Sequence, residues 1–349
     1  MRLMFLRNCW YAAAWERTVS DAPVGVTIIG EKVALYRLSD GTFAGLADAC
    51  PHRKLPLSMG RVKGDVLECG HHGLQFDCTG SCVAAPTNGT VPPGAAVRSF
   101  PVVARYGLLW IWMGEADLAD PDQIFEVRHW DDPAWGRTDG DDMIVRCHHL
   151  YIADNLLDPS HVAWVHLSSF AGSGTDDTPM EVTLDDRGVT VWRWLHDTAP
   201  PPFYAPYLPF EGPTDRKQVY EVRYPSNALI TAVFAPAGTG GEGRDLPPET
   251  FVMDSYNFLT PVDEHTTHYF WFQTRNVAPD DHEVSRRFAA SVRDAFSEDK
   301  VILEAVQRGM DEMTERGEQN LNLRSDVGGV RFRRRLAQLI DAEQPDTRQ

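Results

Sequence analysis

The chain has 349 residues, of which 43% are hydrophobic and 24% are charged. This composition is typical of a folded globular protein of about two domains, and it excludes intrinsic disorder. The formal net charge of −17 argues against a nucleic-acid partner, because phosphate backbones are bound mainly by Lys and Arg. An acidic surface instead suits a basic electron-transfer partner.

No stretch of the sequence approaches the roughly 18 apolar residues of a membrane span, and Arg7 and Asn8 interrupt the first apolar run. We therefore expect a cytoplasmic protein that has neither a membrane anchor nor a signal peptide. Six cysteines in such a chain indicate metal binding or buried thiols rather than a disulfide framework.

Short strands are predicted in the N-terminal third. Residues 27–46 carry β-branched and aromatic runs on both sides of the turn signal Ser39-Asp40-Gly41, which predicts a hairpin, and residues 102–112 form a second such unit. Between them, residues 50–93 are rich in Gly, Pro, Cys and His and show little hydrophobic periodicity. Loops of this length need support, and a bound metal is the expected source of it.

The remaining two thirds of the chain begin with an acidic, Pro-containing stretch, residues 115–142, which we interpret as a linker. An extended segment is predicted at 145–152, followed by alternating strand patterns over 182–257 that are typical of an antiparallel sheet. Residues 282–313 lack Pro and repeat apolar residues at helical spacing, so they predict one long helix or two.

Four metal-binding residues follow the spacing C-x-H and C-x2-H, at Cys50, His52, Cys69 and His72. Each half supplies one thiolate and one imidazole, so the two loops together can offer two Cys to one iron and two His to another, as in a Rieske cluster. A structural zinc site has the same ligand composition and is the alternative. His71 is the competing ligand to His72, although the spacing favours His72.

The other four cysteines are expected to have no ligand role. Cys78 and Cys82 follow a ligand set that is already complete, while Cys9 and Cys147 are interpreted as ordinary buried thiols.

A second constellation has the pattern D-x2-H-x4-H, formed by Asp158, His161 and His166. Two imidazoles and one carboxylate on one face of an iron leave positions open for oxygen and substrate. The third ligand must come from elsewhere; Asp299 in the predicted C-terminal helix is preferred, and Glu298 is the alternative. Read without the first constellation, such residues equally often cap a helix or satisfy buried polar groups.

Several motifs spread over nearly the whole chain are NCWY (8–11), CPHR (50–53), HHGLQFD (71–77), YGLLWIWMG (106–114), DNLLDPSHVAWVH (154–166) and EDKVILEA (298–305). With these motifs the sequence resembles the Rieske non-haem iron oxygenases, and within them the oxygenase components of vanillate O-demethylase, toluenesulfonate methyl-monooxygenase and dicamba O-demethylase. The resemblance implies an α+β protein, with an all-β Rieske domain at 1–115, a linker at 116–142 and a helix-grip catalytic domain at 143–349.

The resemblance also implies roles for particular residues. The [2Fe-2S] ligands would be Cys50, His52, Cys69 and His72, and the mononuclear Fe(II) ligands would be His161, His166 and Asp299. Asp158 would bridge the two metal sites across subunits of a homotrimer, by hydrogen bonds to a histidine of each site. Asn155 is a further candidate for the catalytic site.

The implied activity is that of a monooxygenase component that uses O2 and electrons from NADH or NADPH, delivered by a flavin and iron-sulfur reductase. The expected reaction is O-demethylation or hydroxylation of a small aromatic acid. The alternatives are a ring-hydroxylating dioxygenase and a non-catalytic Rieske electron carrier fused to a ligand-binding domain. Stacking surfaces for the substrate are expected among Trp164, Trp192, Phe270 and Trp271.

Overall fold

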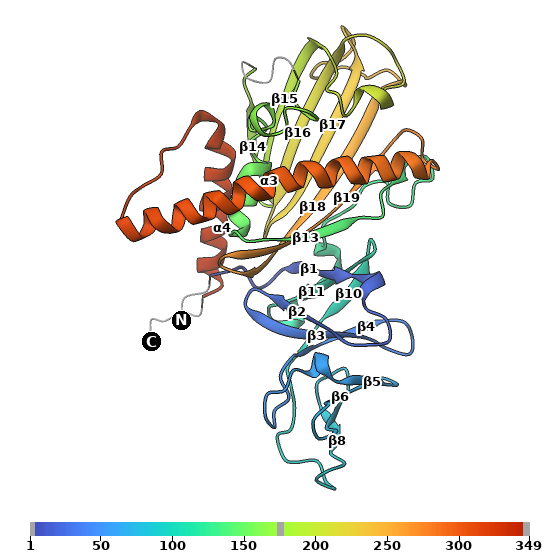
Figure 1. The fold of residues 1–349 in the computed structure, drawn as a ribbon, viewed down its shortest axis with the longest axis vertical. Helices are drawn as coiled ribbons and strands as arrows, with labels where there is room; N and C mark the ends of the chain where they lie inside the picture. The colour runs from blue at the N-terminus through green and yellow to red at the C-terminus, as the bar shows by residue number, and fades with distance from the viewer. Residues whose placement is uncertain (1–3, 173–177, 345–349) are drawn as a thin grey trace. The chain divides into compact units, whose positions relative to one another are not determined.

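A computed structural model describes residues 4–172 and 178–344 (Figure 1). The chain forms two compact units: the first contains Met1–Glu126, Thr260–Asp263 and Leu339–Gln349, and the second contains Val127–Leu259 and Glu264–Gln338. The division after Glu126 falls inside the segment interpreted as a linker. The domain limits at residues 115 and 143 remain a prediction.

The first unit is built from three small antiparallel sheets. The first has the order β1 (Trp10–Trp15), β11 (Leu108–Trp112), β10 (Val102–Arg105); the second β2 (Val24–Ile28), β3 (Glu31–Arg37), β4 (Phe43–Ala47), β9 (Ser99–Phe100); the third β5 (Arg61–Lys63), β6 (Val66–Glu68), β7 (Gln75–Phe76), β8 (Cys82–Ala84). The predicted hairpin at 27–46 is confirmed as β3 and β4, where Gly41 takes the left-handed φ of 87° that the turn requires. The third sheet carries the Cys and His loops.

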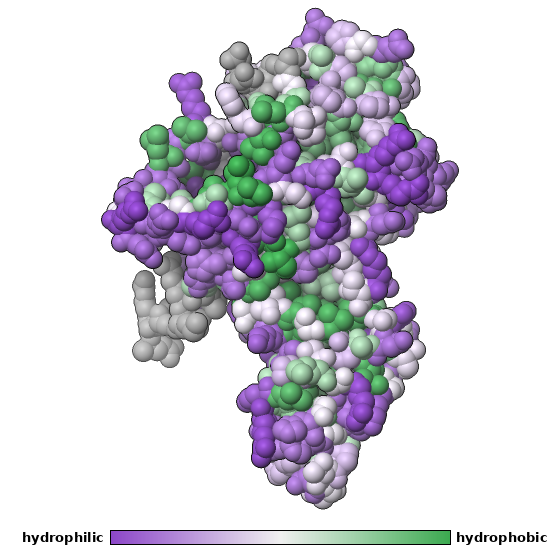
Figure 2. Space-filling view, in the orientation of Figure 1, coloured by the Kyte–Doolittle hydropathy of each residue, from purple (hydrophilic) through white to green (hydrophobic). Residues whose placement is uncertain are grey.

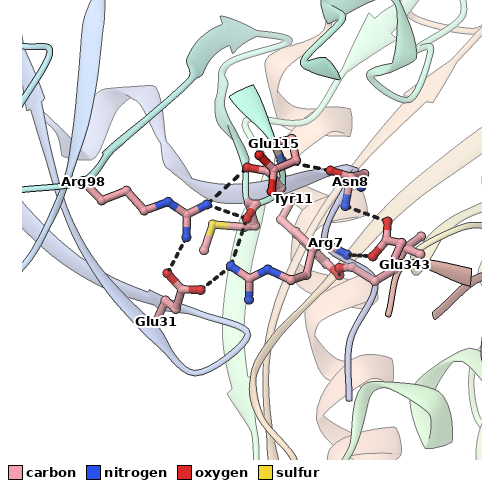
Figure 3. A network of polar contacts seen from close by, with 10 residues as sticks. Arg7, Asn8, Tyr11, Glu31, Arg98, Glu115 and Glu343 are labelled. Atoms are coloured by element: carbon pink, nitrogen blue, oxygen red, sulfur yellow. Dashed lines mark hydrogen bonds and ion pairs between the residues drawn. The ribbon is translucent and has the colours of Figure 1, made fainter. Parts of the chain in front are cut away.

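A polar network fastens the N-terminal segment of the first unit (Figure 3). Arg7 pairs with Glu31 of β3, and the other carboxylate oxygen of Glu31 accepts from Arg98 at 3.1 Å. The carboxylate of Glu343 accepts the backbone amides of Arg7 and Asn8 at 2.7 and 2.9 Å. Because partly exposed ion pairs contribute little net stability, the network mainly orients these segments.

The second unit contains one large antiparallel sheet. Its order is β12-β19-β18-β17-β16-β15-β14, with β13 also pairing to β19. The strands are β12 (Gly136–Arg137), β13 (Asp141–Val145), β14 (Glu181–Leu184), β15 (Gly188–Thr198), β16 (Thr214–Arg223), β17 (Asn227–Pro236), β18 (Phe251–Asp263) and β19 (Thr266–Arg275). The antiparallel sheet predicted from the alternation at 182–257 is confirmed.

Four α-helices accompany this sheet: α1 (His149–Leu156), α2 (Val162–Val165), α3 (His282–Arg316) and α4 (Val327–Ala342). The helical periodicity at 282–313 corresponds to a single helix, α3, which contacts β13 and β19 and lies across the sheet in Figure 1. The extended segment predicted at 145–152 is wrong beyond Val145. The side chain of His148 accepts the amide of Leu150 and so starts α1 where strand pairing ends.

Short 3-10 helices occupy Glu16–Thr18, Leu57–Met59, Ala116–Leu118, Pro121–Gln123, Ala205–Tyr207 and Arg324–Asp326. Two of them lie in the segment interpreted as a linker, which also supplies β12. Among the described residues, no helix combines the length and the apolar character needed to cross a bilayer.

The contribution of α3 packing to the stability of the second unit can be tested by substitution. Phe288 is fully buried on the inner face of α3, with its ring centroid 5.0 Å from that of Phe203 and 4.4 Å from that of Tyr207. Phe288→Ala is expected to lower the free energy of unfolding by about 3–5 kcal/mol, because the removed ring leaves a cavity. Urea unfolding followed by circular dichroism measures the loss; the exposed neighbour Arg287→Ala serves as the control and should change little.

Candidate metal centres and pocket

The loops that carry the first ligand set share one backbone design. In residues 50–55 and 69–74, the Cys amide donates to the carbonyl five residues later, at 2.9 and 2.8 Å. The amide four residues after each Cys donates back to the Cys carbonyl, at 2.8 and 3.1 Å. Both loops turn through a left-handed residue at that position, Lys54 (φ 60°) and Gly73 (φ 75°). Two similar loops therefore present one thiol and one imidazole each.

The four side chains meet between these loops. Cys50 and Cys69 are buried, and a hydrogen bond joins their thiols. The ring centroids of His52 and His72 lie 4.6 Å apart, and Nδ1 of His72 is buried without a hydrogen-bond partner. A buried ring nitrogen without a partner is costly unless a ligand is bound there, so the donor set fits a metal cluster.

The electrostatics around His72 suit a neutral ring. Desolvation, followed by the neighbouring His71 and His52 rings, lowers the pKa of His72, which keeps its imidazole able to bind metal. His71 is exposed and packs beside His72 with ring centroids 3.9 Å apart. The preference for His72 over His71 is therefore consistent with the geometry. Burial, together with the nearby charge of Glu304, raises the pKa of Cys147 to about 12, which fits an inert thiol.

The second constellation forms in the other unit, where the end of α1, the turn at Asp158 and the short helix α2 position two histidines. One ligand atom from each of His161, His166 and Asp299 can be chosen so that all lie within 4.8 Å of one another. Nε2 of His166 and Nε2 of His161 lie 3.3 and 3.8 Å from Oδ1 of Asp299. Two imidazoles and one carboxylate at this separation can hold one metal ion.

Hydrogen bonds on the far side of each ring set its orientation. Nδ1 of His161 lies 2.5 Å from the carbonyl oxygen of Asp158, and Nδ1 of His166 lies 2.7 Å from the carboxylate of Glu298. With each Nδ1–H donating to these acceptors, both Nε2 lone pairs face Asp299. The two acids of α3 therefore have different positions. Asp299 faces the shared site, and Glu298 accepts a hydrogen bond from the opposite side of the His166 ring.

The carboxylates also govern the charge of His166. Its burial disfavours the charged ring, yet hydrogen bonds and charge from Asp299 and Glu298 outweigh that effect and raise the pKa of His166. Asn155 completes this arrangement, because its amide nitrogen lies 3.2 Å from Oδ1 of Asp299 and 3.4 Å from Nε2 of His161. Glu298 as a support for His166 was not predicted from the sequence.

The position of Asp299 follows from the periodicity of α3. The buried residues of this helix are Phe288, Val292, Ala295, Asp299, Leu303 and Gln307. They recur at intervals of three or four, so Asp299 lies in the apolar stripe that packs on the sheet. A buried acid in such a stripe is unfavourable unless it is paired, which was the available signal for a ligand.

A pocket opens beside these ligands. Its walls are formed by Leu156, His161, Val162, His166, Phe170, Tyr204, Arg216, Tyr220, Ile230, Met253, Ser255, Val292, Ala295, Phe296 and Asp299. The expectation that Trp164, Trp192, Phe270 and Trp271 form its stacking surface is wrong. Trp164 is 74% exposed, and Phe270 and Trp271 are buried in the core, so the aromatic walls come from other elements.

Both centres together define a two-domain protein with one cluster-binding domain and one separate metal-binding domain. Residues 9–101 match the Rieske [2Fe-2S] domain, and residues 145–342 match the vanillate O-demethylase oxygenase C-terminal domain. The chain is 35% identical to a putative toluene-4-sulfonate monooxygenase system iron-sulfur subunit of Comamonas testosteroni, over 99% of both chains. It is also 35% identical to a vanillate O-demethylase oxygenase subunit of a Pseudomonas species, over 98% of this chain and 96% of that protein.

Solved structures give the same result. A crystal structure of dicamba monooxygenase with 3,6-dichlorosalicylic acid superposes with a TM-score of 0.90 at 34% identity, covering 97% of this chain and 98% of that one. The chain therefore belongs to the vanillate O-demethylase family of Rieske oxygenases. The predicted α+β fold, with a Rieske domain and a catalytic domain, is confirmed, and residues 9–101, which contain the first candidate ligand set, match a Rieske [2Fe-2S] domain rather than a zinc domain.

The separate positions of the two acids of α3 predict different effects on metal binding. Asp299→Ala should abolish binding of Fe(II), whereas Glu298→Gln should weaken it by roughly 10- to 100-fold, because it loses only the negative charge beside His166 and keeps an acceptor for its Nδ1–H. Chelator competition and iron content per chain measure both. Asp294→Asn, an exposed acid of the same helix, is the control. Equal iron loss in the Glu298 and Asp299 variants would contradict the assignment.

Proposed function

We propose that the protein is the oxygenase component of a Rieske monooxygenase that O-demethylates or hydroxylates a small aromatic acid. The single observation that carries this proposal is the cluster of His161, His166 and Asp299 at the wall of an aromatic-lined pocket, in a chain that also has a Rieske domain. In this proposal Cys50, His52, Cys69 and His72 bind the [2Fe-2S] cluster, and the three pocket residues bind Fe(II). A solved dicamba monooxygenase structure contains non-heme iron with dicamba.

The overall reaction balances for a methoxy substrate. One O2, two electrons and two protons convert an aryl methyl ether to an aryl hemiacetal and water, and the hemiacetal then collapses to the phenol and formaldehyde. When bound, the cluster supplies single electrons and the mononuclear iron supplies dioxygen activation. The chain itself orients the ligand rings through Asp158 and Glu298, and Phe170, Tyr204, Tyr220 and Phe296 form an aromatic wall for the substrate.

The electrons are proposed to come from NADH or NADPH through a flavin and iron-sulfur reductase, so the protein is placed in the cytoplasm, where these donors are held. The net charge of −17 supports docking to a basic partner. A homotrimer is also part of the proposal. Large apolar side chains exposed in the second unit support an interface; they include Trp164, Leu167, Val301, Leu321 and Leu323. Apolar patches also interrupt the hydrophilic surface in Figure 2.

Within that trimer, Asp158 is proposed to connect the cluster of one subunit to the iron site of the next. Its carbonyl already holds His161, and its carboxylate accepts the amide and hydroxyl of Ser160. The same residue therefore fixes a ligand ring and the turn that precedes it. A half-buried carboxylate at this point is suited to accept a further hydrogen bond from a neighbouring subunit.

The activity test uses iron-loaded protein with a surrogate reductase and NADH, across aryl methyl ethers, aryl methyl acids and unsubstituted aromatic acids. Product and formaldehyde are both quantified. Formaldehyde equal to phenol product is expected from the methoxy acids, because each collapse of the hemiacetal releases one molecule of each. Reductase-dependent cluster reduction without product from any compound would instead support an electron carrier.

The variant Asp158→Asn is expected to keep both metals but to lose nearly all turnover, a fall of about 100-fold. Asn retains an oxygen that can accept from Ser160, so the turn and the carbonyl contact to His161 should persist. Iron content, cluster absorbance and NADH-driven turnover are measured together, with the exposed Asp186→Asn as the control. Full turnover in the Asp158 variant would disprove the bridging role.

A further inference from the structure

The pocket beside the metal ligands contains a buried arginine. Arg216 lies on β16, is only 3% exposed, and forms part of the pocket wall together with His161, His166 and Asp299. Alternation along the strand places Tyr220, another wall residue, on the same face and turns Lys217 to the opposite face. A polar residue therefore stands where the strand pattern would normally place an apolar one.

Among the described residues, the positive charge of Arg216 has no acidic partner. In the part of the chain that the structure describes, no carboxylate lies within ion-pair distance of its guanidinium, and its Nε is buried without a hydrogen-bond partner. The adjacent acid, Asp215, is used elsewhere, because its carboxylate accepts the amides of Gly238 and Gly240 at 2.8 and 2.9 Å. An unpaired buried charge is costly, and such cost is usually retained where a ligand supplies the partner.

Neighbouring tyrosines cannot supply the missing negative charge. Burial raises the pKa of Tyr204, an effect that Arg216 only partly offsets, so this phenol stays protonated. Burial likewise raises the pKa of Tyr220, whose oxygen accepts from Gln218 at 3.3 Å. Tyr220 therefore keeps its own O–H as a donor. Asp299 is the one acid among the pocket-wall residues, and it faces the two histidines.

Aromatic rings span the distance between Arg216 and the metal ligands. The guanidinium carbon lies 5.5 Å from the ring centroid of Tyr204, which lies 5.7 Å from that of Phe170. Phe170 in turn lies 6.0 Å from the ring centroid of His166. Successive ring contacts thus connect Arg216 with the metal ligand His166, and all four side chains line the same pocket.

We propose that Arg216 is the substrate-specificity residue, which binds the oxyanion of an aryl carboxylate or sulfonate while the reacting methyl group faces the metal ligands. Its planar guanidinium can donate two parallel hydrogen bonds to such a group, and Tyr220 can donate a third. This inference rests on the proposed function.

The test compares 2-, 3- and 4-methoxybenzoate, 4-methoxybenzenesulfonate and the neutral 4-methoxybenzamide. The wild-type protein is expected to prefer the acids over the neutral amide, and comparison of the three methoxybenzoates shows which position of the acid suits the pocket. Arg216→Gln should raise KM and Kd for the preferred acids by roughly 10- to 100-fold, since a charge-assisted hydrogen-bond pair is lost. KM for the amide should stay unchanged. Arg216→Lys keeps the charge but not the planar fork and should lie between.

Lys217→Gln is the matched control, because it removes one positive charge from the same strand outside the pocket; Lys217 instead pairs with Glu242 at 3.4 Å. Iron content and cluster absorbance establish that each variant is folded. If Arg216→Gln does not fold, the comparison is made with Arg216→Lys instead. Equal KM values for acid and amide in the wild type, or equal losses for both in Arg216→Gln, would overturn the proposal.

The sulfonate arm identifies which oxyanion is preferred, and either result supports the proposal if it depends on Arg216. Equilibrium dialysis with 4-methoxybenzoate separates this inference from the proposed function. If no compound yields formaldehyde or hydroxylated product, the proposed function fails, yet tighter binding of the acid by wild type than by Arg216→Gln still supports Arg216 as the anion site. If product forms but acid binding is independent of Arg216, only this inference fails.

Discussion

Packing of α3 onto the large sheet is the constraint on which the second unit depends. The helix buries one stripe of side chains, and Asp299 occupies a position in that stripe between Ala295 and Leu303. A carboxylate there is stable only if cations or hydrogen-bond donors surround it. Asn155 supplies one donor, and a metal ion bound together with His161 and His166 would supply the charge. The packing of α3 thereby also positions the carboxylate of the candidate metal site.

The same principle applies at the opposite end of the pocket. Arg216 and Asp299 are buried charges of opposite sign that do not pair with each other in the described structure, although both contribute to one wall. Pairing them would neutralise the pocket and remove its capacity for a metal and an anion. Because they are not paired with each other, both are available to ligands. Ligands of opposite charge would offset the cost of burying each group.

The first unit solves a different problem, because its ligand loops have few apolar side chains to hold them. Repeated backbone hydrogen bonds in residues 50–55 and 69–74 give the two loops the same shape. Cys50 and Cys69 are buried where the two loops meet. The spacing difference between C-x-H and C-x2-H is tolerated because the hydrogen bonds are anchored at each Cys rather than at the His.

Much of the fold and of the candidate sites could be predicted from the sequence alone. Local spacing predicted both candidate ligand sets, and periodicity predicted the antiparallel sheet and α3, because these features depend on neighbours within a few residues. The strand prediction at 145–152 failed beyond Val145, because strand and helix patterns are hard to separate over so short a run. The side chain of His148 caps the first turn of α1 at this point. Only the tertiary structure distinguished Asp299 from Glu298, placed Arg216 in the pocket and excluded the four predicted aromatic residues. Those facts depend on contacts between segments far apart in the chain, which no local pattern encodes.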